Sequence, residues 1–149
     1  MADPRFAVYT ASDVVIVSPI PLSEGLAEDT FLKITYPERY GDTRGVDGSV
    51  CRHSIKNHMA DVEVTLKGFS VHNLELSAIH IADLVAGNGG GIGAFGVLDP
   101  NGTSVFTATR SWIAQAPELS FGEQRADVTW KFRCMYVPAL CFIGGNNTP

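Results

Sequence analysis

Alternating apolar and polar residues predict that most of this chain folds as β-strands. The clearest case is the segment 61–67, where Val62, Val64 and Leu66 alternate with polar positions. The segments 31–36 and 128–136 alternate in the same way, and the second places a Trp and a Phe two positions apart as core anchors. Each segment is therefore expected to turn one face to a core and the other to a polar surface.

Weaker patterns predict further strands at residues 14–17, 49–55, 94–98 and 103–115. Asp99-Pro-Asn-Gly102 supplies Pro and Gly for a turn, so the last two strands are expected to form a hairpin. In the longest strand, the side chains expected to share one core-facing side are Phe106, Ala108, Trp112 and Ala114.

Between Lys67 and Gly93 the apolar spacing changes to that of an amphipathic helix. Ser70 fits the N-cap position and Gly87 the stop, so we expect a helix over about residues 71–86. The apolar face expected to pack on the core consists of Val71, Leu74, Ala78, Ile81, Ala82 and Val85.

Together these elements predict an α+β fold that is mainly β: a β-sandwich or partly closed barrel with one flanking helix. A chain of 149 residues fits a single domain, here 1–149, which can bury about 70% of its unfolded surface. The segment Pro37–Gly48 interrupts the pattern and is expected to be a long charged loop between two strands. A loop of this length usually has a function or is disordered.

Composition indicates a globular protein that does not grip nucleic acid. Hydrophobic residues make up 45% of the chain, charged residues 18%, and the formal net charge is −5. An acidic balance disfavours tight binding to phosphates but suits a wall past which DNA slides. Residues 1–12 lack the pattern of a secretory signal, and the apolar runs are too short to span a membrane. The product is therefore expected to stay in the cytoplasm where it is made, without membrane insertion.

The sequence contains only weak matches to catalytic, nucleotide-binding and metal-binding motifs. Gly91–Gly96 matches G-x-G-x-x-G, but these glycines follow a helix and open a strand, the reverse of a dinucleotide site. His53 and His58 have no third metal ligand at a recognisable spacing. The sequence contains no P-loop, nucleophile elbow or H-E-x-x-H motif. We therefore expect no enzymatic activity, no cofactor and no metal site.

Three cysteines occur without C-x-x-C spacing: Cys51, Cys134 and Cys141. One interpretation is that they are buried, reduced thiols. The other is a disulfide between subunits, for which Cys51 and Cys141 are the candidates.

The order of the segments adds a resemblance. Residues 28–57 read EDTFLKITYPERYGDTRGVDGSVCRHSIKN, residues 93–106 read GAFGVLDPNGTSVF, and residues 111–134 read SWIAQAPELSFGEQRADVTWKFRC, before a terminal FIGGN. In this order, from about Val14 to Asn146, the chain resembles a family of small tail structural proteins of contractile-tailed bacteriophages that are similar to tail tube subunits.

The resemblance implies hexameric rings in which strands of six subunits join into one barrel around a lumen. Rings would stack head to tail through the Pro37–Gly48 loop and through terminal arms at about 1–13 and 138–149. The residues implied to contact the next ring are Arg39, Tyr40, Asp42, Arg44 and Asp47. The candidates for a net-acidic lumen lining are Lys33, Thr35, Asp61, Glu63, Thr65 and Lys67.

The implied function is a hollow conduit for DNA passage into the host, in a virion tail assembled in the bacterial cytoplasm. The implied partners are further copies of the chain and the sheath, baseplate and tail terminator proteins, with viral DNA passing without specific binding. Two structural alternatives remain open: the tube of a tailocin or type VI-like injection device, and a baseplate or tail-tip ring. A third is a monomeric ligand-binding β-barrel, whose cavity would be lined by Phe106, Trp112, Trp130 and Phe132.

Overall fold

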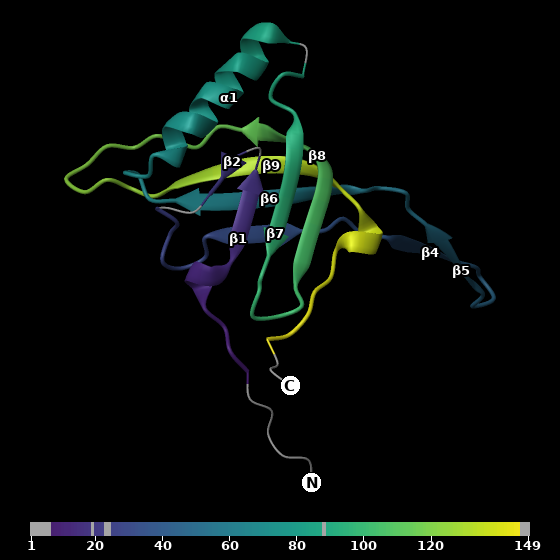
Figure 1. Ribbon diagram of the computed structural model, residues 1–149. Helices are drawn as coiled ribbons and strands as arrows, with labels where there is room; N and C mark the ends of the chain where they lie inside the picture. Colours follow the sequence, from purple (N-terminus) through teal and green to yellow (C-terminus); the bar gives the residue numbers. More distant parts are fainter. Residues whose placement is uncertain (1–6, 19, 23–24, 88, 147–149) are drawn as a thin grey trace.

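The computed structural model describes residues 7–18, 20–22, 25–87 and 89–146 (Figure 1). Within these residues, seven strands form one antiparallel sheet in the order β2-β1-β7-β8-β9-β6-β3, which curls into half a barrel. The strands of this sheet are β1 (Val15–Ser18), β2 (Ile20–Pro21), β3 (Leu32–Thr35), β6 (Met59–Leu66), β7 (Gly93–Leu98), β8 (Val105–Gln115) and β9 (Val128–Tyr136). The protein is thus α+β and mainly β, as predicted, and takes the partly closed barrel form.

The core lies on the inner side of this curled sheet. Alternate residues of β6 and β9 are buried there, so the predicted alternation of both strands is confirmed. Phe95 on β7 packs against Phe106 and Phe132, with ring centroids 6.1 and 5.4 Å apart. The buried apolar side chains of β6, β8 and β9 are Ala60, Val62, Val64, Leu66, Phe106, Ala108, Ile113, Val128, Trp130, Phe132, Cys134 and Tyr136.

The alternation of buried and exposed residues is interrupted within the long strand β8. Its pairing with β9 shifts between Ala108 and Arg110, which marks a bulge. Beyond the bulge Ser111 and Ile113 are buried, while Trp112 is half-buried on the opposite side. The prediction that Trp112 and Ala114 share the core face with Phe106 is therefore wrong, because one extra residue in a strand exchanges its two faces.

Helix α1 (His72–Ala86) forms where it was predicted, but it turns a different face to the core. Gly87 ends it in the left-handed conformation, with φ of 63°. At the other end the Ser70 hydroxyl accepts a hydrogen bond from the His72 N–H at 3.4 Å. Leu76 is fully buried, whereas Leu74 and Val85, both expected in the core, are 77% and 82% exposed.

The orientation of α1 has an identifiable cause. Asn73 donates to the carbonyl of Lys67 at 3.0 Å and accepts from the indole N–H of Trp130, also at 3.0 Å. Leu76 and Ile79 lie over Ser111 and Phe132 at the open end of the sheet. Because α1 has apolar residues on both sides, these tertiary contacts select the inward side.

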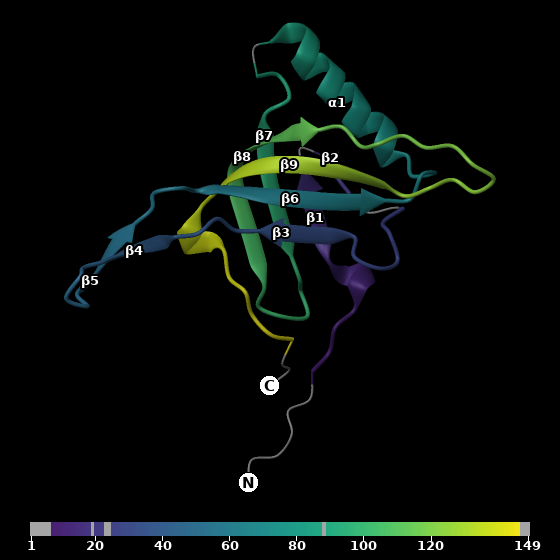
Figure 2. The ribbon, with the colours of Figure 1, turned by 180° about the vertical axis from the view of Figure 1, so that it is seen from behind.

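The segment Pro37–Gly48 is not a loop, contrary to prediction. Residues Tyr40–Arg44 form β4, which pairs with β5 (Val50–Ser54) in a separate antiparallel ribbon. The sequence of β4 shows no apolar–polar alternation, because neither strand of the ribbon has a buried face. Figure 2 shows the ribbon projecting away from the curled sheet, beyond the ends of β3 and β6.

The described parts of the expected arms lie against the body. After the short 3-10 helix η2 (Pro138–Leu140), Phe142 pairs with Val105 of β8 through two backbone hydrogen bonds of 2.8 and 2.9 Å. The N–H of Val8 donates to the carbonyl of Asn146 at 3.0 Å, just before the 3-10 turn η1 (Ala11–Asp13). Residues 1–6 and 147–149 of the expected arms lie outside the described residues.

Candidate assembly surfaces

The β4–β5 ribbon is exposed along almost its whole length. Every residue of β4 and β5 is exposed except Gly41, which is half-buried. Gly41 leaves space for the ring of its cross-strand partner His53, since a side chain there would collide with the imidazole. The ribbon is closed at its base by a hydrogen bond from the Ile55 N–H to the Arg39 carbonyl at 2.8 Å.

A compact turn holds the tip of the ribbon. The N–H of Gly45 donates to the carbonyl of Ser49 at 2.7 Å, and Gly48 has φ of 89°. The carboxylate of Asp47 accepts hydrogen bonds from the Ser49 hydroxyl at 2.7 Å and the Ser49 N–H at 3.1 Å. These two bonds, the hydroxyl first, hold the pKa of Asp47 below its ordinary value.

The ribbon has two chemically different faces. Tyr40, Asp42 and Arg44 alternate onto one face of β4, so the structure brings three of the five predicted ring-contact residues together. Arg39 lies at the base and Asp47 at the tip. The sequence analysis missed Arg52 of β5, whose guanidinium lies 4.3 Å from the centre of the Tyr40 ring. The opposite face carries Gly41, Thr43, Cys51 and His53.

Five of the six predicted lumen residues lie on the outward face of β3 and β6, and the sixth, Lys67, directly follows β6. Lys33 is opposite Glu63, and Thr35 is opposite Asp61. Thr65 forms a 3.1 Å hydrogen bond with Thr129 of β9, and Lys67 forms a 3.5 Å ion pair with Asp127. The six candidates are Lys33, Thr35, Asp61, Glu63, Thr65 and Lys67.

This face is not net acidic, because the six candidates comprise two basic and two acidic side chains and β9 adds two basic residues beside them. That the face lines a lumen stays a prediction. Strand β9 pairs with β6 and places Lys131 opposite Glu63. It also places Arg133 beside Asp61, with a nitrogen–oxygen distance of 3.4 Å. Alternation identified the polar side of each strand, but the sequence does not reveal which strands pair, so the basic residues of β9 were not assigned to this face.

The cysteines differ in accessibility. Cys51 is exposed on the ribbon. Cys141 is half-buried, and its sulfur lies 3.4 Å from both the backbone nitrogen and the carbonyl oxygen of Thr107. Cys134 is buried in the core, and burial raises the pKa of its thiol to about 12. Of the two candidate inter-subunit thiols, Cys51 is therefore the accessible one.

The four aromatic residues named for a ligand cavity do not line one common cavity. Trp130, Phe106 and Phe132 are packed in the core, and Trp112 lies on the other side of β8. A groove of about 430 Å³ instead opens at the mouth of the half-barrel. Its lining is mainly apolar and comprises Tyr9, Val14, Leu32, Ile34, Tyr36, Val97, Asp99, Ser104, Val105, Phe106, Phe142, Ile143 and Asn146.

One edge of the described sheet ends in β3. The Thr65 N–H donates to the carbonyl of Phe31 at 2.9 Å, which makes 31 and 65 a hydrogen-bonded pair of the β3–β6 ladder. The backbone groups of Leu32 and Ile34 therefore point away from β6, to the outer edge of the sheet. Such an edge accepts a further strand.

The described residues contain no cluster of three or more metal-ligating side chains. Among the same residues, no helix has the length and apolar character needed to cross a membrane. Comparisons with protein-family models and with curated proteins gave no match to this sequence.

Proposed function

We propose that this chain is a structural subunit of the tail tube of a contractile-tailed bacteriophage. Copies form hexameric rings that stack into a hollow conduit, and DNA passes through the conduit into the host. The observation that carries the proposal is the β4–β5 ribbon, which projects from the body and exposes nearly every residue.

The ribbon has no core of its own. An isolated two-stranded ribbon is marginally stable in water, so a surface that covers it supplies packing that the single chain lacks. Tyr40, Asp42 and Arg44 lie on one face and offer an aromatic ring and both charges for polar contacts. In a stack of rings, the next subunit is the surface that each ribbon meets.

The edge at β3 supports lateral joining of subunits. Its outward-pointing backbone groups, at Leu32 and Ile34, pair with a strand of the neighbouring copy when rings close. Closure of this kind removes exposed edges from the assembly.

The outward face of β3, β6 and β9 is the proposed wall of the lumen. It is polar, and the basic residues Lys131 and Arg133 lie beside acidic residues of β6. Basic groups that are already paired attract phosphates less than unpaired ones, so DNA slides without a strong grip. The assembled tube belongs to the virion tail, is built in the bacterial cytoplasm, and is contacted by sheath, baseplate and terminator proteins.

Electron microscopy of the purified full chain tests the proposal. Negative staining at high protein concentration is expected to show hollow tubes or six-fold rings. The triple variant Tyr40→Ala, Asp42→Ala, Arg44→Ala is expected to leave rings that no longer stack. The double variant Glu123→Ala, Gln124→Ala, in the exposed β8–β9 connection, is the matched control. A uniform monomer at high concentration would contradict the proposal.

A tube from a phage-derived injection device would have the same shape and a different content. Purified particles from producing cells distinguish the two. DNA protected from nuclease inside the tail after particle disruption supports a DNA conduit, whereas tubes that never contain DNA indicate the injection device.

A further inference from the structure

The turn between β7 and β8 contains a chemically reactive pair, Asn101-Gly102. The side-chain amide of an asparagine is attacked by the backbone nitrogen of the following residue, and glycine favours this attack because no side chain shields its nitrogen. The chain has one other Asn-Gly pair, Asn88-Gly89, and Asn88 lies outside the described residues. Asn101 and Gly102 are both half-buried and keep access to water.

The reaction turns the amide into a carboxylate in two steps. The Gly102 nitrogen forms a bond to the side-chain carbonyl carbon of Asn101, and the bond from that carbon to the amide nitrogen breaks. The amide nitrogen leaves as ammonia, which carries the proton of the Gly102 N–H. Water then opens the cyclic imide to aspartate or to isoaspartate, in which the backbone runs through the former side chain. Nothing is oxidised or reduced, and water is the co-reactant.

Both reacting groups are hydrogen-bonded in the folded chain. The side-chain amide of Asn101 donates to the carboxylate of Asp13 at 2.9 Å. The N–H of Gly102 donates to the carbonyl of Asp99 at 3.2 Å and closes the turn. Attack needs the Gly102 nitrogen free of its turn bond and the Asn101 side chain free to rotate. Each of the two bonds therefore opposes the reaction.

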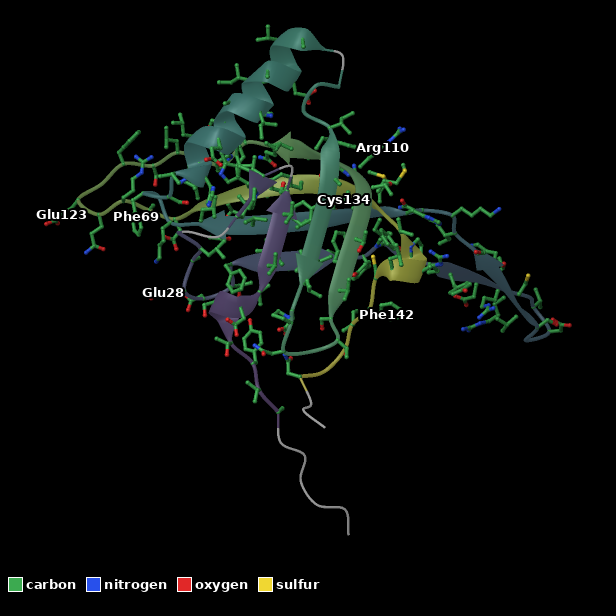
Figure 3. All side chains as sticks on the ribbon, viewed as in Figure 1. Glu28, Phe69, Arg110, Glu123, Cys134 and Phe142 are labelled. Carbon is green, nitrogen blue, oxygen red and sulfur yellow. The ribbon has the colours of Figure 1, made fainter. Side chains whose placement is uncertain are left out.

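The same turn holds the segments that lead to both chain ends. On the N-terminal side it is bonded to Asp13 of η1. On the C-terminal side, the Thr103 N–H donates to the carbonyl of Gly145 at 3.2 Å. Figures 1 and 2 agree that the turn lies at the same end of the molecule as both chain ends, and Figure 3 shows Phe142 of the C-terminal segment beside β8.

We propose that Asn101 is a site of spontaneous deamidation and that Asp13 delays the reaction by holding the Asn101 amide. Asp13 is thus a positioning residue, and the modification loosens both chain ends from the β7–β8 turn. The inference concerns a single copy of the chain and does not depend on the proposed function.

Both products disturb the packing at the turn. Aspartate removes the amide that donates to Asp13 and places a second negative charge beside it. Isoaspartate adds one carbon to the backbone next to Gly102, where a Cβ atom would already lie 2.9 Å from the Gly145 carbonyl oxygen. The backbone of the turn then has to move away from the C-terminal segment.

Timed incubation of the full chain tests the site. Wild type, Asp13→Ala and Asp29→Ala are held in the same mildly alkaline buffer, and mass spectrometry of fragments separates Asn101 from Asn88. Asp13→Ala is expected to raise the rate at Asn101 about tenfold, equivalent to about 1.4 kcal/mol, because it removes a hydrogen bond to a charged group. Asp29→Ala removes another exposed carboxylate, one not bonded to Asn101, and should leave the rate unchanged.

A conservative variant and the unfolded chain complete the comparison. Asp13→Asn keeps an oxygen that accepts from the Asn101 amide, so an intermediate rate is expected; it also replaces Asp13→Ala if circular dichroism shows that the latter has lost its fold. The chain unfolded in urea gives the intrinsic rate. Equal rates in wild type and both Asp13 variants would refute the role of Asp13. A folded wild type that reacts as fast as the unfolded chain, or an unfolded chain that does not react at Asn101, would overturn the inference.

Hydrogen exchange tests the release of the chain ends. The deamidated chain carries one more negative charge and is separated by ion exchange. The N–H groups of Val8 and Thr103, which donate to the carbonyls of Asn146 and Gly145, are expected to exchange faster than in the unmodified chain. The N–H of Thr65, bonded within the β3–β6 ladder, is the control and should not change. Unaltered exchange at Val8 and Thr103 would show that the chain ends stay attached, against the proposal.

Discussion

At the scale of single residues, hydrogen bonds of polar side chains stabilise places where few apolar side chains pack together. Asp47 accepts two hydrogen bonds from Ser49 and closes the ribbon tip without any buried contact. Asn73 joins the start of α1 to the sheet by accepting from the indole of Trp130. Each bond compensates for missing apolar packing, so each has a measurable local effect.

The first prediction concerns the titration of Asp47. Hydrogen bonds from Ser49 favour the ionised carboxylate, so its pKa in the folded chain lies below the ordinary value. The stabilisation of the tip is present above the ordinary pKa and is lost as the pH falls through the lowered folded pKa. Carboxyl NMR titration is expected to show this lowered midpoint, and Ser49→Ala should move it upwards. An identical midpoint in both proteins would contradict the assignment.

The second prediction compares the two tryptophans. Trp130→Phe removes a 3.0 Å hydrogen bond and leaves the Asn73 oxygen without this donor, so we expect a loss of about 1–3 kcal/mol in the free energy of unfolding. Trp112→Phe, half-buried on the other side of the sheet, is the matched control and should cost less. Urea denaturation measures both. Equal losses would argue against a special role for the Trp130–Asn73 bond.

At the scale of elements, α1 shows that the presence and the orientation of a helix have different causes. Its residues have helical apolar spacing and a glycine stop, which are local properties. Its inward side is selected by Leu76 and by the bonds of Asn73, which are tertiary. Leu74, Ile81 and Val85 on the other side of the helix are consequently left exposed.

The third prediction separates the two sides of α1. Leu76→Ala is expected to lower the free energy of unfolding by about 2–5 kcal/mol, because it empties a fully buried position. Leu74→Ala, two residues away, should change it by at most about 0.5 kcal/mol, because that side chain is exposed. Thermal denaturation of dilute, unassembled protein provides the comparison. The reverse order would mean that the helix turns its Leu74 side to the core after all.

At the scale of the whole molecule, the structure separates a packed body from several exposed surfaces. The half-barrel buries a continuous aromatic and aliphatic core. The ribbon, the β3 edge and the outer side of α1 lie at different places around it. Surfaces distributed in this way suit a subunit that meets several neighbours.

The fourth prediction follows from that distribution. In the unassembled chain, trypsin is expected to cut first after Arg44 and Arg52, because the ribbon has no core and opens locally at little cost. In assembled tubes these two sites should be cut much more slowly. Limited proteolysis with mass spectrometry measures both rates, and Arg125 in the exposed β8–β9 connection serves as the comparison site. Equal cleavage of the ribbon in both states would contradict its burial between rings.

Local periodicity was sufficient for much of the fold. Strands β6 and β9, the Asp99–Gly102 turn, the existence of α1 and its end at Gly87 all follow from side-chain spacing and turn chemistry. The outward polar side of β6 and the charged residues of the ribbon were recognisable for the same reason, because each depends on neighbours within a few positions.

The tertiary structure decided the features that depend on distant contacts. The bulge after Ala108 exchanged the faces of β8, and its pairing with β9 shows this where the sequence does not. The pairing of β6 with β9 added Lys131 and Arg133 to the proposed wall, and the pairing of β4 with β5 made a ribbon of an expected loop. Apolar spacing identifies a side chain that gains by leaving water, but it does not say whether the core or another subunit will cover it. That choice depends on the space above Ser111 and Phe132. Leu76 occupies this space, so Leu74 stays on the exposed side of the helix.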